Sequence, residues 1–93
     1  MQGFEWDEDK AEANWREHGV RFTDAVEVFN DQRRKVEPDY YESKDRWRTV
    51  GMTQRGHLLV VVYTYRGDDI IRIISARHAE PRERRLYHGN RKV

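Results

Sequence analysis

The feature that most constrains the fold is a run of six consecutive apolar residues, Leu58 to Tyr63, in a chain with 38% charged residues. In a strand, alternate side chains point to opposite faces. Both sets are apolar here: Leu59, Val61 and Tyr63 on one face, and Leu58, Val60 and Val62 on the other. We therefore expect His57–Tyr65 to be the central strand of a sheet that is covered on both sides.

Two further strands are predicted beside it, Arg46–Thr53 and the β-branched segment Ile70–Arg77. The connections contain Gly56 and Gly67, which suit tight turns. These segments predict an antiparallel meander of three or more strands.

Helices are predicted before and after the meander in the chain. Asp7 is a suitable N-cap and Gly19 a suitable stop for a first helix, which we expect to turn a stripe of Ala11, Trp15 and His18 toward the core. Phe4–Trp6 before it is predicted to be a short strand or a hydrophobic staple.

A second helix is expected from the cap Thr23 to about Asn30, followed by a loop over residues 31–45 that contains Pro38. Pro81 is typical of the first turn of a helix, so a last helix is predicted from there to Gly89. The whole chain, residues 1–93, is therefore expected to be a single α+β domain with two N-terminal helices, the meander and a C-terminal helix.

Several classes of protein are excluded by composition and spacing. The longest apolar run is far shorter than the roughly 20 residues of a membrane-spanning helix, and no signal peptide is visible. The chain has no cysteine, so it has no disulfide or thiolate metal site. The four histidines lack the spacing of metal ligands. We expect a cytoplasmic protein with no metal, no cofactor and no membrane partner.

Charge is distributed unevenly along the chain. Residues 1–29 hold eight acidic and three basic residues, a net charge of −5, while residues 30–93 hold nine acidic and fifteen basic residues, a net charge of +6. This asymmetry indicates two surfaces with different partners, one of which is a polyanion, or else a solvated surface of mixed charge.

The C-terminal region combines bases with aromatic residues. Guanidinium groups bind phosphate in a bidentate manner and aromatic rings stack on unpaired bases, so the region is a candidate RNA-binding surface. Its candidate residues are Arg77, Arg82, Arg84, Arg85 and Tyr87. The structural alternative is a solvated helix.

Arg72 alternates with apolar residues on the predicted third strand. A charge in that position is either paired with an acid of the N-terminal helices or acts as a phosphate clamp. In a regular strand Arg77 points to the opposite face from Arg72, and a bend would relax this. On the first helix, Lys10, Asn14 and His18 lie along one flank, where they are either ordinary surface or packed residues or part of a site.

Read in order, the chain resembles the BrnT family of toxins. The resemblance covers about residues 4–88, and the residues that carry it are Phe4-Glu5-Trp6-Asp7, Lys10, Asn14, Glu17-His18-Gly19-Val20, Phe22, Arg46, Gly51, Leu58 to Tyr63, Arg72 to Arg77, Glu83-Arg84 and Tyr87. The chain departs from the family at Glu17, where a lysine is common, and at His78, where arginine or lysine is common.

The resemblance implies a RelE-like fold and a ribonuclease that arrests translation. It also implies an antitoxin similar to BrnA, which would connect the toxin to operator DNA. RNA supplies its own nucleophile, the 2′-hydroxyl, so the protein needs a base, an acid and cations rather than a metal.

On this hypothesis Arg72 and Arg77 stabilise charge, and His78 and His18 transfer protons. Lys10 and Tyr87 position the phosphate or stack a base. The competing hypotheses are a non-catalytic nucleic-acid-binding module and a protein-binding module.

Overall fold

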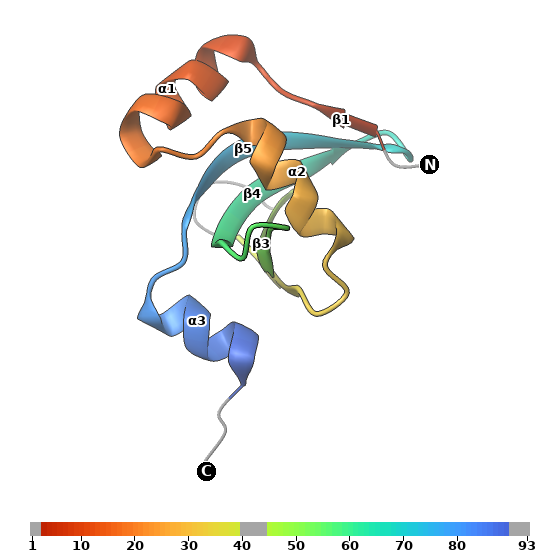
Figure 1. Cartoon of the computed structure of the whole chain (residues 1–93). Helices are drawn as coiled ribbons and strands as arrows, with labels where there is room; N and C mark the ends of the chain where they lie inside the picture. Colours follow the sequence, from red (N-terminus) through yellow and green to blue (C-terminus); the bar gives the residue numbers. More distant parts are fainter. Residues whose placement is uncertain (1–2, 40–44, 90–93) are drawn as a thin grey trace.

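The computed structural model of the chain describes residues 3–39 and 45–89 (Figure 1). In chain order these residues form β1 (Gly3–Glu5), α1 (Glu8–His18), α2 (Phe22–Glu27), a 3-10 turn η1 (Val28–Asn30), β2 (Lys35–Pro38), β3 (Arg46–Met52), β4 (Leu58–Arg66), β5 (Ile70–His78) and α3 (Pro81–His88). No helix among these elements is long and apolar enough to cross a membrane. The α+β class is confirmed.

The five strands form one mixed sheet in the order β1-β5-β4-β3-β2. The meander β3-β4-β5 is antiparallel, and β4 is the central strand, as the apolar run predicts. β1 pairs in parallel with β5 over three residues only, so the predicted short strand at the N-terminus exists.

β2 is a correction to the predicted loop over residues 31–45. Residues 35–38 of that loop pair in an antiparallel manner with β3, while residues 40–44 lie outside the described residues. The segment is short and polar and ends at Pro38, a composition found at sheet edges. Its pairing with β3 makes it a strand, and local sequence does not reveal that pairing.

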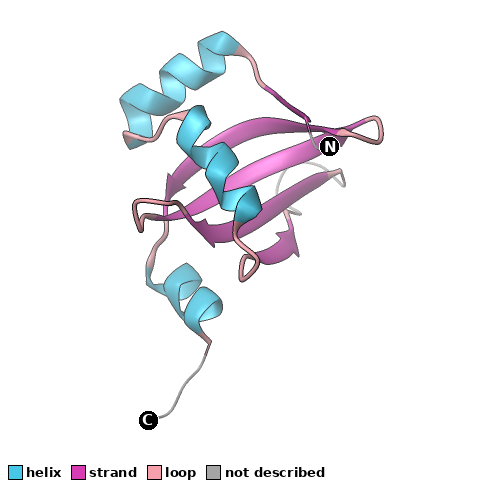
Figure 2. Ribbon diagram, turned by 45° about the vertical axis from the view of Figure 1, so that its right-hand side comes forward, coloured by secondary structure: helices cyan, strands magenta, loops and turns pink. Residues whose placement is uncertain are grey.

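The sheet carries a hydrophobic core on each face. α1, α2 and η1 lie on one side, as Figures 1 and 2 show, and pack Phe22, Ala25 and Val28 against the odd-numbered side chains of β4. On the other side α3 lies near one end of the sheet and packs Leu86 and Tyr87 against Leu58, Val60 and neighbouring residues. Both faces of β4 are therefore covered, which explains its continuous apolar run.

The predicted core stripe of α1 is wrong in part. Asp7 caps the helix and Gly19 ends it with φ = 65°, as expected, and Ala11 packs against the core. Trp15, however, is 42% exposed, and His18 is exposed as well. The buried residue is Asn14, only 5% exposed, because its amide takes the place of a hydrogen-bonding strand beside β5.

The second predicted helix, from Thr23 to about Asn30, differs from the observed elements. α2 begins at Phe22 rather than after Thr23, because the carbonyl of Arg21 already accepts hydrogen bonds from the amides of Asp24 and Ala25. It ends at Glu27, and Val28–Asn30 continue as the 3-10 turn η1. α3 begins at Pro81 and is closed by a capping box in which Glu80 and Glu83 each accept from the other's backbone amide.

Candidate functional site

A β-bulge decides which side chains of β5 share a face. The register between β4 and β5 shifts between Val62 and Tyr63, whose partners are Ser75 and Ile73. Ile74 is the extra residue, so the alternation of side chains is reset along β5. Arg72 and Arg77 therefore lie on the same face, opposite α1 and α2, whereas a regular strand would have separated them.

Two further guanidinium groups join them there. Arg48 of β3 shares this face because its cross-strand partner is Val62, and Arg82 reaches it from the first turn of α3. We call the surface formed by Arg48, Arg72, Arg77 and Arg82 the arginine face. Three of these four residues are on strands and are thereby held at fixed spacing.

Carboxylates partner three of these arginines in exposed or half-buried ion pairs. Arg72 Nη1 lies 2.8 Å from Glu5 Oε2. An acidic partner was predicted on one of the N-terminal helices, but Glu5 lies on the strand β1. Arg48 and Arg82 share Glu37 at 2.8 Å and 3.1 Å. Burial would raise the pKa of Glu37, but the hydrogen bonds from Arg82 and Arg48 outweigh it and lower that pKa.

Arg77 has the most buried partner. Its guanidinium donates to both oxygens of Glu83, at 3.0 Å and 3.2 Å, and Glu83 is only 3% exposed. The hydrogen bond from Arg77 lowers the pKa of Glu83 despite its burial, and the same bond raises the pKa of Arg77. Arg77 therefore serves as an anchor for α3 while a third of its side chain remains exposed.

The predicted proton carriers lie elsewhere. His78 ends β5 on the other face of the sheet, since its cross-strand partner is Leu59 rather than Val60. Its ring contacts the ring of His57 edge-on, with the centroids 5.8 Å apart. His18 ends α1 and lies 3.8 Å from Glu17. The structure thus places Arg72, Arg77 and Arg82 on one face of the sheet, with Arg72 four positions along β4 from Arg77, and both histidines away from that face.

His57 and His78 line a pocket of about 400 Å³ together with Arg21 and Arg55. We call these four residues and this cavity the histidine pocket. Trp15, Asp24 and Leu59 are also among its walls. Sequence reasoning missed Arg21, Arg55 and His57, because only the pairing of β4 with β5 shows that His57 and His78 are neighbours.

The other predicted RNA-binding residues are spread over helices. Lys10 on α1, and Arg84 and Arg85 on α3, are exposed. Tyr87 is half-buried, and its hydroxyl donates to Asp31 at 2.6 Å. Burial and that hydrogen bond raise the pKa of Tyr87, so the hydroxyl holds α3 to the turn before β2.

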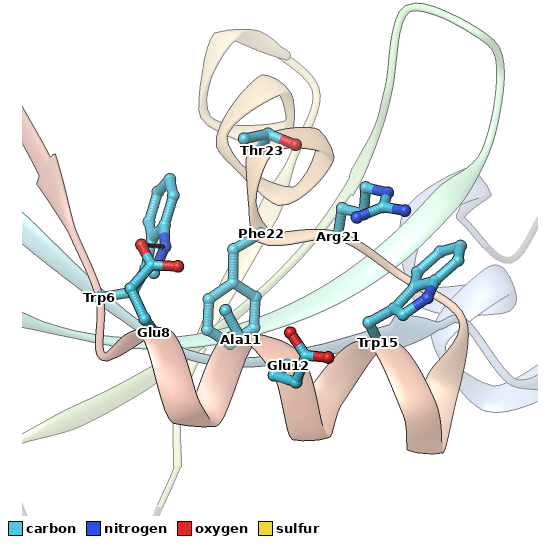
Figure 3. Close-up of a pocket in the computed structure, with 8 residues that line it drawn as sticks. All are labelled: Trp6, Glu8, Ala11, Glu12, Trp15, Arg21, Phe22 and Thr23. Carbon is cyan, nitrogen blue, oxygen red and sulfur yellow. Dashed lines mark hydrogen bonds between the residues drawn. The ribbon is translucent and has the colours of Figure 1, made fainter.

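A groove of about 270 Å³ lies between α1 and the start of α2 (Figure 3). Trp6 and Trp15 stand toward its two ends, with Phe22 between them, and Glu8 and Glu12 contribute carboxylates. Trp15 and Arg21 line both this groove and the histidine pocket. The guanidinium carbon of Arg21 lies 4.0 Å from the centre of the Trp15 ring, so this stack separates the two cavities.

Comparisons with known proteins agree with this fold. A model of the family described as the ribonuclease toxin BrnT of type II toxin–antitoxin systems matches residues 6–83. Among solved structures, the chain is similar to the ribonuclease toxin BrnT of Brucella abortus, with a TM-score of 0.71 and 26% sequence identity over 86% of this chain and 99% of that one. Curated proteins include no significant sequence match. Because the family model spans most of its length, the chain belongs to the BrnT family of ribonuclease toxins of type II toxin–antitoxin systems.

Proposed function

We propose that the protein is a toxin that cleaves RNA without a metal and thereby inhibits translation, and that the arginine face is where it holds the reacting phosphate. The observation that carries this proposal is the β-bulge, which sets Arg72 and Arg77 on one face beside Arg48 and Arg82. Family membership supports the ribonuclease activity.

The proposed reaction is attack of a ribose 2′-hydroxyl on the adjacent phosphate. The 2′-oxygen loses its proton, a new P–O bond forms, and the bond to the 5′-oxygen breaks as that oxygen gains a proton. Negative charge accumulates on the phosphorane, so fixed cations at this position lower the barrier. In our proposal Arg72 and Arg77 take this role, and Arg82 holds a neighbouring phosphate.

The carboxylates on this face have a defined part in the proposal. Glu5 and Glu37 hold Arg72, Arg48 and Arg82 in place before RNA binds. A guanidinium has five N–H donors, so one that bonds to a single carboxylate oxygen still has donors for a phosphate. The ion pairs therefore hold these arginines in position before RNA binds and leave some of their N–H groups free to donate to a phosphate.

The wider proposal concerns the partner and the fold. Type II toxins have a protein antitoxin, and we propose one similar to BrnA, which covers the arginine face and connects the complex to operator DNA. We also propose a RelE-like arrangement of the catalytic surface. Lys10, Arg84 and Arg85 are then peripheral contacts to RNA, because they are exposed on α1 and α3 and do not belong to the arginine face.

The test compares variants that remove a cation with variants that only remove its partner. Purified protein should shorten RNA equally with and without EDTA. Arg72→Gln should slow cleavage about 100-fold, the size typical for the loss of one group that stabilises the transition state. Glu5→Gln removes the ion pair but keeps the cation and a side-chain oxygen that can still accept from it, so the rate should fall far less than in Arg72→Gln.

Three results would contradict the proposal. If Arg72→Gln and Glu5→Gln lower the rate equally, the ion pair matters and the cation does not. If RNA stays intact with every preparation but binds with steep salt dependence, the protein is a non-catalytic RNA-binding module. Loss of cleavage in EDTA, restored by a divalent cation, would show that the reaction depends on a metal.

A further inference from the structure

The histidine pocket differs from the arginine face in its charge balance. Each arginine of the arginine face has a carboxylate partner. Within residues 3–39 and 45–89, by contrast, none of Arg21, Arg55, His57 and His78 forms an ion pair with a carboxylate. Among the described residues that line the pocket, Asp24 alone is acidic, against the guanidinium groups of Arg21 and Arg55. The described part of the pocket therefore holds more positive than negative charge.

The groups of the pocket come from three separate segments that the fold fixes in place. Arg21 precedes α2 and stacks on Trp15. Arg55 and His57 belong to the turn between β3 and β4, where the amide of His57 donates to Thr53 Oγ1 and its carbonyl accepts from Thr53 N. His78 is held by its pairing with Leu59. Such convergence on one cavity is typical of binding sites for small charged groups.

We propose that the histidine pocket is a second RNA subsite, which takes one phosphate of a single-stranded segment while the neighbouring base lies against Trp15. Two guanidinium groups and two imidazoles match the charge and the acceptor oxygens of a phosphodiester. The indole of Trp15 is 42% exposed at the border of the pocket, and such rings stack on unpaired bases. This subsite rests on the proposed function.

The acidic groove of Figure 3 determines on which side of Trp15 the phosphate of the nucleotide lies. Glu8 and Glu12 on the far side of the Trp15–Arg21 stack would repel a phosphate. The phosphate is therefore directed into the histidine pocket. Arg77 and His78 are consecutive residues that point to opposite faces of β5, so an RNA strand reaches from the arginine face to the pocket by passing around the end of this strand.

The experiment uses the full chain and a short single-stranded DNA, which has phosphates and bases but lacks the 2′-hydroxyl that is needed for cleavage. NMR titration should show saturable shifts of the ring signals of His57 and His78 and of the Trp15 indole N–H. Inorganic phosphate should bind more weakly and shift the two histidines only. Binding is read in this way without any cleavage.

The matched variants remove equal charge inside and outside the pocket. Arg55→Gln with His57→Gln should weaken DNA binding about tenfold or more, as expected for the loss of charge-assisted hydrogen bonds. Arg16→Gln with His88→Gln removes the same residue types from exposed positions outside the pocket and should change affinity less than about twofold.

Three outcomes would overturn the subsite. The first is that DNA shifts the signals of His18 and His88 as much as those of the pocket residues. The second is that the two double variants bind DNA equally. The third is that phosphate binds while the oligonucleotide does not. RNA cleavage is measured separately on the same proteins. If the protein cleaves RNA but DNA does not bind at the pocket, the subsite is wrong and the proposed ribonuclease function stands. If DNA binds at the pocket but RNA is not cleaved, the binding site stands and the proposed ribonuclease function is wrong.

Discussion

Asn14 shows how one polar side chain can replace part of a strand. β1 covers one edge of β5 only as far as Arg72, so the backbone of Ala76, which pairs with β4 on its other side, has no strand on this edge. The amide of Asn14 fills that place: its oxygen accepts from Ala76 N at 3.0 Å, and its nitrogen donates to Ala76 O at 2.8 Å and to Val20 O at 2.9 Å. This side chain therefore links α1 both to β5 and to the segment that follows the helix.

We expect Asn14→Leu to lower the free energy of unfolding by about 3 kcal/mol or more. A leucine has the same branching and the same number of side-chain heavy atoms but no polar atom, so it leaves two carbonyls and one amide buried without partners, and each such group is costly. Urea denaturation measures the change. Arg16→Gln on the exposed side of the same helix serves as the control and should stay within about 0.5 kcal/mol of the parent. A similarly small effect of Asn14→Leu would mean that water replaces the lost bonds.

The close contact between η1 and β3 depends on Gly51, which has no side chain. η1 lies against β3 at Gly51, where an added Cβ would come 2.5 Å from Val28 Cγ1 and 3.1 Å from Arg34 Cβ. Gly51 also faces the core side of the sheet, since it pairs with Leu59. The 3-10 turn can therefore approach the strand closely enough to bury Val28.

Gly51→Ala should destabilise the protein by about 2–3 kcal/mol, because η1 has to move away from β3 or Val28 has to leave its rotamer. Thermal unfolding measures this. Gly56→Ala gives the comparison: its φ is +84° and its surroundings are open, so it should lose only about 1 kcal/mol from backbone strain. An unchanged midpoint in Gly51→Ala would show that the turn shifts without loss of packing.

At the scale of the whole molecule, α3 is attached through carboxylates. Glu83 binds Arg77, Glu37 binds Arg82, and Asp31 accepts from the Tyr87 hydroxyl. For Glu83, the hydrogen bond from Arg77 lowers the pKa. For Glu37 and Asp31, burial alone would raise the pKa, but hydrogen bonds outweigh it and lower it. All three groups are thus stabilised in their charged form by contacts with the last helix or with residues that it binds.

This arrangement predicts acid-sensitive docking of α3. A carboxyl whose folded pKa is below its unfolded value stabilises the fold above the unfolded value, and that contribution is lost as the pH falls through the folded pKa. The ordinary values are 4.5 for Glu83 and Glu37 and 3.8 for Asp31. Stability should therefore decrease as the pH falls below about 4.5.

Amide exchange measures where this loss begins, and protection should fall first in α3. Glu83→Gln should be less stable at neutral pH, and its stability should depend less on pH in the acidic range, because Gln cannot titrate. If the acid dependence of Glu83→Gln equals that of the parent chain, the loss of stability arises from other carboxyl groups.

The sequence alone determined the features that depend on neighbouring residues. The apolar run placed β4 at the centre of the sheet, and Asp7, Gly19 and Pro81 marked the ends of helices, because capping groups and restricted φ angles act within one turn of the chain. The charge of Arg72 on an apolar strand indicated either an acidic partner on the N-terminal helices or a phosphate clamp. The structure shows an acidic partner, Glu5, which lies on a strand instead.

Only the tertiary structure decided how distant segments meet. The bulge that unites Arg72 and Arg77, the pairing that makes residues 35–38 a strand, and the contact of His57 with His78 all arise from registers between strands. Asn14 is buried because it bonds to Ala76, 62 positions away in the chain. Helical periodicity does not show this contact, and it predicted that Trp15 would be buried instead. Register is a property of two chain segments at once, and a one-residue shift moves every side chain to the other face.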